Sequence, residues 1–238
     1  TYAAGERHGR HTDALSRISL LVRGGYREEA TSGAITMRPG DVLLKSRRAA
    51  HEDAFGESGA TLVALEFLQD DPFDAPEAHD LWRRRSDGYA MRHAVAFLEA
   101  ALAGDRLSAG AAGEDLVADC GRTPSRRSAA PLWLRRIKDA LEEGGLAEVD
   151  VASHARAAGA HPAHASRLFR QCYGQSITEY AQAQSVRRAV ALLGERDASL
   201  SDTAAAAGFY DQSHMNRVFR RVLGRSPGAH RTLLAALR

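Results

Sequence analysis

The sequence predicts an α+β protein of two domains, in which a mostly β N-terminal domain precedes an all-α C-terminal domain. The first observation is length, because the chain has 238 residues and a globular domain usually holds about 100–200. The second is a change of pattern along the chain: short apolar runs separated by Gly, Pro and Asp give way to helical spacing of apolar residues. The third is an internal repeat in the C-terminal part.

Four short segments of the N-terminal region have the composition of strands. They are residues 18–22, 34–37, 42–44 and 61–67. We expect the first to end at Gly24 and Gly25, and Gly, Pro or Asp separates the others as in turns. This pattern predicts a small antiparallel sheet or barrel over about residues 1–75.

Helical spacing begins after Pro76. Residues 77–85 and 88–103 are expected to form helices that cover the barrel, so the first domain spans residues 1–120 with its helices at about 77–119. Residues 121–130 have no apolar period and are predicted to form an exposed linker. Pro131 suits the first turn of a helix over Leu132–Glu143. A second domain, residues 131–238, is expected to begin there and to fold by itself.

Charge and composition narrow the function class. From Pro131 onward the chain has 15 Lys and Arg against 10 Asp and Glu, a net charge of +5, whereas residues 1–130 have 17 against 20, a net charge of −3. A basic C-terminal part favours a polyanion partner. There is no apolar run of about 18 residues, so no membrane helix is expected. No secretory signal is visible, and two cysteines are too few for a disulfide framework. We therefore expect a cytoplasmic protein with reduced thiols.

The C-terminal part repeats itself. Residues 151–159 match residues 200–208, and residues 164–174 match residues 214–224, with His, Arg, Phe, Arg and Gly at the same relative positions of the second pair. Each unit has the pattern of an Ala-rich helix, a glycine, a tight turn and a second helix, which is the helix-turn-helix plan. A long helix over Ile177–Gly194 is expected to join the two units. Two units in register are far more specific for DNA binding than one.

The second unit ends in a recognisable signature. Residues 208–227 are Gly-Phe-Tyr-Asp-Gln-Ser-His-Met-Asn-Arg-Val-Phe-Arg-Arg-Val-Leu-Gly-Arg-Ser-Pro. The glycine, the Ser-x-x-x-Arg-x-Phe core and the Gly-x-Ser-Pro ending resemble the AraC family of bacterial transcription regulators, over about residues 132–234. The resemblance implies a sequence-specific transcription regulator whose two recognition helices enter successive major-groove faces of one double-stranded DNA site. RNA polymerase is a further candidate partner.

The two recognition helices are expected to present different outward faces. In the first helix the outward residues are Ala163, His164, Ser166, Arg167 and Arg170, and in the second they are Gln212, Ser213, Asn216, Arg217, Arg220 and Arg221. Arginine pairs with guanine and asparagine with adenine, while other arginines bind phosphates. Because Ala163 and Ser166 are small, base recognition by the first helix is expected to depend on Arg167 and His164. The inward residues are expected to be Leu168, Phe169 and Tyr173 in the first helix, and Val218, Phe219, Val222 and Leu223 in the second.

The β region keeps the spacing of the two cupin motifs, although its residue types differ. The first motif falls on Gly5, His11, Asp13, Arg17 and Gly24, and the second on Gly40, residues 46–48 and His51. The resemblance implies a barrel that binds a small-molecule effector. His11, Arg17 and His51 would line a pocket for an anionic or polar compound. The helices after the barrel would pair two subunits into a homodimer.

The cupin resemblance leaves the metal question and two other functions open. Arg17 stands where cupins have a glutamate ligand, and its charge opposes a divalent metal. His11, Asp13 and His51 remain the candidate ligands, and we expect a metal-free pocket without a cofactor. One alternative is a metal-binding cupin enzyme fused to a DNA-binding domain, which Arg17 argues against. The other is an architectural DNA-binding protein, which the complete β domain argues against. No enzymatic activity is expected.

Overall fold

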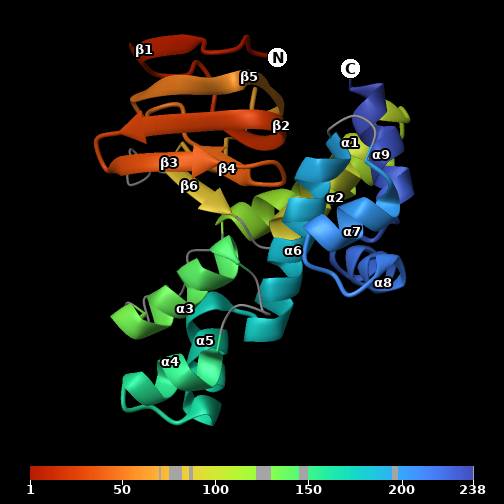
Figure 1. Ribbon diagram of the computed structural model, residues 1–238. Coiled ribbons are helices and arrows are strands. Elements are labelled where there is room, and N and C mark those ends of the chain that lie inside the picture. Colours follow the sequence, from red (N-terminus) through yellow and green to blue (C-terminus); the bar gives the residue numbers. More distant parts are fainter. Residues whose placement is uncertain are drawn as a thin grey trace.

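Most of the N-terminal part forms one antiparallel sheet, and the described residues from Gly88 onward are mostly helical (Figure 1). The computed structural model describes residues 1–69, 71–74, 82–85, 88–121, 130–144, 150–194 and 198–237. This architecture confirms the predicted α+β class, with a β part followed by a helix-turn-helix part.

The described sheet has six strands in the order β1-β5-β2-β4-β6, with β3 paired to β2. The strands are β1 (Arg7–His11), β2 (Arg17–Ala30), β3 (Gly33–Met37), β4 (Val42–Lys45), β5 (His51–Glu66) and β6 (Trp82–Arg85). All of the pairs are antiparallel. The predicted strands at 18–22 and 61–67 are therefore parts of the two longest strands, β2 and β5.

The prediction that the first strand ends at Gly24 and Gly25 was wrong. The chain continues as strand to Ala30 through a register shift beside Gly24. Gly24 has φ +77°, and a Cβ there would lie 1.9 Å from the carbonyl oxygen of Gly59 on the neighbouring strand. Glycine thus permits a bulge and a close approach of two strands, and the pairing with β5 outweighs its usual role as a strand terminator.

The helix predicted at residues 77–85 is contradicted in its last part. Residues 82–85 are strand β6, which pairs with β4 so that Arg85 lies opposite Val42. An edge strand such as β4 offers unpaired backbone groups, and hydrogen bonding to them outweighs local helix preference. The earlier part of the predicted helix, residues 77–81, lies outside the described residues. The helix predicted at 88–103 is confirmed as α1 (Gly88–Leu102), and α2 (Arg106–Gly121) follows it.

The C-terminal part contains the helix predicted after Pro131, the five helices that the repeat predicted, and a further helix at its end. They are α3 (Leu132–Glu143), α4 (Val151–Ala157), α5 (Pro162–Tyr173), α6 (Ile177–Gly194), α7 (Leu200–Ala206), α8 (Gln212–Leu223) and α9 (Pro227–Ala236). Helices α3, α4 and α5 gather at one end of α6, and α7, α8 and α9 gather at its other end (Figure 1). Of the predicted linker, Gly121 ends α2 and residues 122–129 lie outside the described residues. Among the described residues, we find no helix with the length and hydropathy that crossing a membrane requires.

Two apolar cores divide the helical part unequally. The smaller one contains Leu134, Ile137, Leu141, Phe169, Ile177, Tyr180 and Ala181, all from α3, α5 and the start of α6. The larger one joins β2, β4, α1 and α2 to the second half of α6 and to α7, α8 and α9. The second helix-turn-helix unit therefore shares its core with the N-terminal part. A domain boundary at residue 131 stays a prediction.

Ion pairs also cross between the sheet and the helices. Asp41, at the start of β4, lies 2.7 Å from a guanidinium nitrogen of Arg187 on α6, and both side chains are buried. Arg225, just after α8, pairs with Glu99 of α1 at 3.2 Å. These contacts place α6 and α8 directly against the N-terminal part.

Candidate nucleic-acid interface and N-terminal polar cluster

Local capping signals define both recognition helices. Helix α5 begins at His161, whose ring accepts a hydrogen bond from the Ala163 amide at 3.2 Å, and α8 begins at Asp211, whose carboxylate accepts one from the His214 amide at 2.6 Å. Gly174 and Gly224 end the two helices in the left-handed conformation, both with φ +74°. Such a cap suits glycine because a side chain would be strained there.

The turns within the two units use glycine in the same way. Gly159 follows α4 with φ +69°, and Gly208 follows α7 with φ +82°. Ala155 and Ala204 on these short helices are almost fully buried, so small side chains let the helices of each unit approach closely. The role predicted for the repeated glycines and alanines is confirmed.

The inward faces of the recognition helices are also as predicted. Phe169 and Phe219 occupy equivalent positions and are both 0% exposed. Around them lie Leu168 and Tyr173 in the first helix, and Val218, Val222 and Leu223 in the second. Ala165 of α5 and Met215 of α8 are equivalent and both buried, so the first unit fills this position with a much smaller side chain.

The outward face of α5 has few free polar groups. All five residues predicted for it are exposed: Ala163, His164, Ser166, Arg167 and Arg170. The Ser166 hydroxyl donates to the Pro162 carbonyl at 3.3 Å, which is a bond within its own helix. Arg170 lies 3.6 Å from a carboxylate oxygen of Glu179 on α6. Arg167 and His164 are the longer polar side chains that remain.

The outward face of α8 is richer in long polar side chains. Gln212, Ser213, Arg217, Arg220 and Arg221 are exposed, and Asn216 is half-buried. The sequence interpretation missed Tyr210, which is 92% exposed and lies two residues before the helix begins. Its position within the signature was the available signal.

The residues predicted for an effector or a metal in the N-terminal part do come together. Arg17 donates a hydrogen bond to the Asp13 carboxylate. The His11 and His51 rings lie 4.3 Å apart between centroids, and Nε2 of His51 is 3.8 Å from Oδ2 of Asp13. His51 is fully buried, whereas the His11 side chain is 34% exposed. The spacing of the cupin motifs therefore located one real cluster of polar side chains.

The sequence interpretation missed the residue at the centre of this cluster. Nζ of Lys45 lies 2.9 Å from Oδ2 of Asp13, 3.1 Å from Oε2 of Glu28 and 2.6 Å from Nε2 of His51. Lys45 is 2% exposed, and it ends the short apolar strand β4. A lysine that continues a buried apolar strand was the available signal, because a buried ammonium group needs partners.

The charges of this cluster are balanced around Lys45. Burial alone would raise the pKa of Asp13, but the neighbouring Lys45 ammonium and Arg17 guanidinium outweigh burial and lower it. Burial, together with the charges of Glu28 and Asp53, raises the pKa of Tyr26 strongly, so its hydroxyl stays protonated. The single proton of this hydroxyl is shared between the carboxylate of Glu28 and Oδ1 of Asp53, the latter at 2.8 Å. Asp13, Glu28 and His51 thus surround an ammonium group.

Comparison with known proteins identifies the helical part. A family model described as a helix-turn-helix domain matches residues 154–232. The chain is 30% identical over 114 residues to the HTH-type transcriptional regulator GlxA of Rhizobium meliloti (strain 1021), a match that covers 45% of this chain and 35% of that protein. It is 33% identical over 95 residues to the arabinose operon regulatory protein of Escherichia coli (strain K12), which covers 40% and 32%.

Residues 154–232 of the chain are a helix-turn-helix domain, and this part is similar to the matching part of the arabinose operon regulatory protein. Each of these matches spans only about a third of the relative's length. Among solved structures, an AraC-type regulator from Chromobacterium violaceum has a TM-score of 0.39 at 22% identity, covering 43% of this chain and 92% of that one. ToxT from Vibrio cholerae O395 has a TM-score of 0.41 at 10% identity, covering 98% and 95%.

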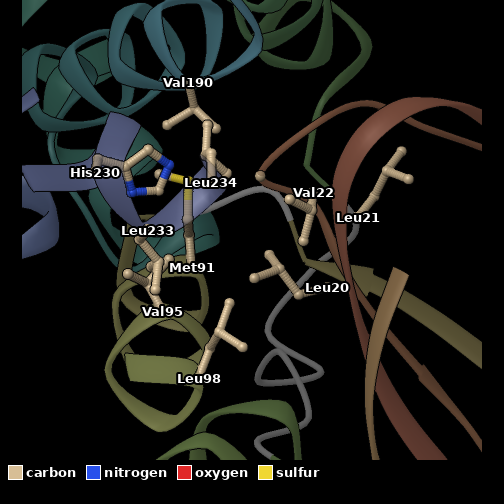
Figure 2. A pocket seen from close by; sticks show the side chains of 11 residues that line it. Leu20, Leu21, Val22, Met91, Val95, Leu98, Val190, His230, Leu233 and Leu234 are labelled. Carbon is tan, nitrogen blue, oxygen red and sulfur yellow. The ribbon is translucent and has the colours of Figure 1, made fainter. Parts of the chain in front are cut away.

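A small cavity lies where the helix-turn-helix domain meets the sheet. Figure 2 shows β2 on one side of this cavity, where Leu20 and Val22 face side chains of α1, α6 and α9 while Leu21 points the other way. The helical side chains that line it are Met91, Val95, Leu98, Val190, His230, Leu233 and Leu234. It measures about 10 Å³, the space that a single water molecule needs. An effector of ordinary size does not fit there unless the two parts move apart.

Proposed function

We propose that the protein is a DNA-binding transcription regulator controlled by a small-molecule effector that its N-terminal part binds. The observation that carries this proposal is the pair of recognition helices at opposite ends of one helix, each with a polar outward face. Helix α6 has 18 residues and is therefore about 27 Å long at 1.5 Å per residue. That length is of the order of one DNA turn, about 34 Å, so both helices can reach one face of a duplex.

The second recognition helix is proposed to provide most of the base recognition. Arg217 and Asn216 are placed to pair with guanine and adenine, and Arg221 to bind a phosphate. On the first helix, Arg167 and His164 take the base-reading role, because Ala163 and Ser166 do not reach far. Electrostatic contacts of these arginines with phosphates would supply much of the affinity.

Control by an effector is proposed to act through the shared core. Arg17 and His11 are partly exposed beside the buried cluster around Lys45, and they suit an anionic or polar compound. Strand β2 carries Arg17 and also contributes Ile18, Leu20 and Val22 to the core that contains α8. A ligand that moves β2 would therefore act on the second recognition helix without an intervening linker.

The remaining partners are proposals that rest on the exposed surface and on the regulator function. Helices α1 and α2 and the turn between them expose large apolar side chains at Tyr89, Leu102 and Leu107, at 56%, 51% and 87%. We propose that these helices pair two chains into a homodimer, and that the bound protein acts on RNA polymerase. A regulator of this kind works in the cytoplasm and needs no catalytic activity.

Selection of bound sequences from a random DNA pool tests the proposal. We expect enrichment of a site with two unequal halves about one helical turn apart, the better defined half belonging to α8. Affinity for the selected site should fall steeply with salt, since protein–phosphate contacts release counterions. A pool without enrichment, together with binding that salt does not change, would contradict the function.

A further inference from the structure

We propose that the N-terminal part binds one Zn²⁺ ion between His8, His11 and Asp53, at the edge of the sheet. This site is separate from the cluster around Lys45 and does not depend on the proposed regulatory function. Nδ1 of His8 lies 3.5 Å, and Nε2 of His11 lies 3.7 Å, from Oδ2 of Asp53. All three atoms lie within 4.8 Å of one another. Tetrahedral Zn²⁺ with bonds of about 2.0–2.1 Å needs ligand atoms about 3.4 Å apart, so a small adjustment closes the set.

Strand pairing brings the two histidines to one face. His8 and His11 are three residues apart on β1, so in a regular strand their side chains would point to opposite faces. A register shift lies between them, with His8 opposite Asp53 and His11 opposite His51 on β5. An extra residue in one strand reverses the alternation, and such bulges often redirect functional side chains.

Hydrogen bonds at the far side of each ring set the tautomers. Nε2 of His8 lies 2.9 Å from the Glu6 carboxylate, and Nδ1 of His11 lies 2.8 Å from the Gly9 carbonyl oxygen. The Ala3 amide also donates to the Glu6 carboxylate, at 2.7 Å. Both oxygens only accept, so the ring nitrogens that face them must donate. In the neutral rings, the nitrogens facing Asp53 therefore carry lone pairs.

With both rings neutral, three electron-pair donors therefore converge on one place. Two lone pairs facing a carboxylate oxygen repel it unless a cation lies among them. Oδ1 of Asp53 accepts from Tyr26 at 2.8 Å, which orients Oδ2 toward the histidines. Carboxylate and carbonyl partners behind the ligands are the usual second layer of a metal site. Two imidazoles with one carboxylate suit Zn²⁺, and the exposed sides of His8 and His11 leave room for a water ligand.

The cluster around Lys45 does not offer the same site. Its donors Asp13, Glu28 and His51 lie within 2.6–3.1 Å of the Lys45 ammonium, so they already face a cation. The atoms of Lys45 fill the place that an ion would need. The donors that remain for an ion are therefore those of His8, His11 and Asp53.

Calorimetric titration of the chelator-treated full-length protein with ZnCl₂ tests the site. We expect one Zn²⁺ per chain, affinity lowered by more than about tenfold in His8→Ala, and lowered by about 10–100-fold in Glu6→Gln, which removes only the carboxylate behind His8. His154→Ala is the matched control, since His154 is an exposed histidine that also bonds a backbone oxygen through Nδ1. This control should bind Zn²⁺ as the unchanged protein does.

Two outcomes would overturn the proposal. Absence of Zn²⁺ binding by the unchanged protein would mean that protons alone neutralise these groups. Binding that survives in both His8→Ala and Glu6→Gln but is lost in Asp13→Asn would place the ion in the Lys45 cluster. Circular dichroism of each variant shows that it is folded, and Glu6→Gln keeps the test decisive if His8→Ala disturbs strand β1.

Discussion

The two helix-turn-helix units share one plan but differ in what surrounds them. In the first unit the Phe169 ring meets Tyr180 edge to face at 5.5 Å, and in the second the Phe219 ring meets His230 in the same way at 5.6 Å. Tyr180 donates to Glu142 of α3. The two ring nitrogens of His230 have no hydrogen-bond partner among the described residues. The polar side chain beside the buried phenylalanine therefore has a hydrogen-bond partner in the first unit, where it is Tyr180. In the second unit it is His230, whose ring nitrogens have no such partner among the described residues.

The surroundings explain this difference. The first unit closes its core with α3, and its described ion pair to the sheet is the 3.7 Å contact between Arg84 and Glu142. The second unit packs against the second half of α6 and α9, and it completes its core with α1, α2 and β2. A duplicated motif can thus keep its recognition geometry while its two copies take separate roles. The first copy is held by α3 and the start of α6, and the second is joined to the N-terminal part.

Replacing the two equivalent phenylalanines with alanine is expected to have the largest effect on the free energy of unfolding, and it tests whether the two units have separate cores. Phe169→Ala and Phe219→Ala should each cost about 3–5 kcal/mol, because each removes a fully buried ring and leaves a cavity. Hydrogen exchange should show the loss around α3, α4 and α5 for Phe169→Ala, but also in α1 and β2 for Phe219→Ala. If both variants lost hydrogen-exchange protection in the same helices and strands, the division into two cores would be wrong.

Acid should weaken the second unit through His230. Burial, with a smaller effect from Arg225, lowers the pKa of His230 to about 3 from 6.5. The unfolded state binds the proton more tightly between these values, so stability is fully present above about pH 6.5 and is lost as the pH falls toward 3. At pH 5 the loss is about 2 kcal/mol, from 1.36 kcal/mol per pKa unit. Denaturant unfolding of His230→Leu at pH 7 and pH 5 should show a smaller pH effect than the unchanged protein.

Arginine substitutions should separate the two recognition faces. Arg217→Ala should cost about 1–3 kcal/mol on the selected site and relax the preference at one base pair. Arg167→Ala is the matched change on the first helix and should remove nearly all of the weaker base discrimination there. Titration of each variant against single-base variants of the site measures both effects. If Arg217→Ala keeps full affinity and preference, another face of α8 enters the groove.

The smallest expected effect belongs to Arg221. This side chain is exposed one turn beyond Arg217 and is placed for a phosphate. Arg221→Ala should therefore weaken binding to all sequences about equally, and should lower the slope of log affinity against log salt by about 1. Loss of preference at a single base pair, with an unchanged salt slope, would show that Arg221 reads a base instead.

The sequence by itself determined the helical part almost completely. The bounds of α3 and α6, the capping glycines and the inward phenylalanines all follow from signals within one or two turns of the chain. Local signals suffice there because a helix satisfies its own backbone hydrogen bonds, and its apolar period shows which face is buried. The motif spacing also brought His11, Asp13, Arg17 and His51 together, although it did not show what they surround.

Only the tertiary structure decided the features that depend on distant parts of the chain. Residues 82–85 form strand β6 because they can pair with β4, which would otherwise lie at the edge of the sheet. Strand β2 continues beyond Gly24 because β5 pairs with β2 both before and after this glycine. Lys45 lies at the centre of the polar cluster because three strands bring their charges to one place, and a bulge turns His8 toward Asp53. These strand pairs and polar contacts depend on packing and hydrogen bonding between segments that are far apart in the sequence. A local sequence pattern contains no information about them.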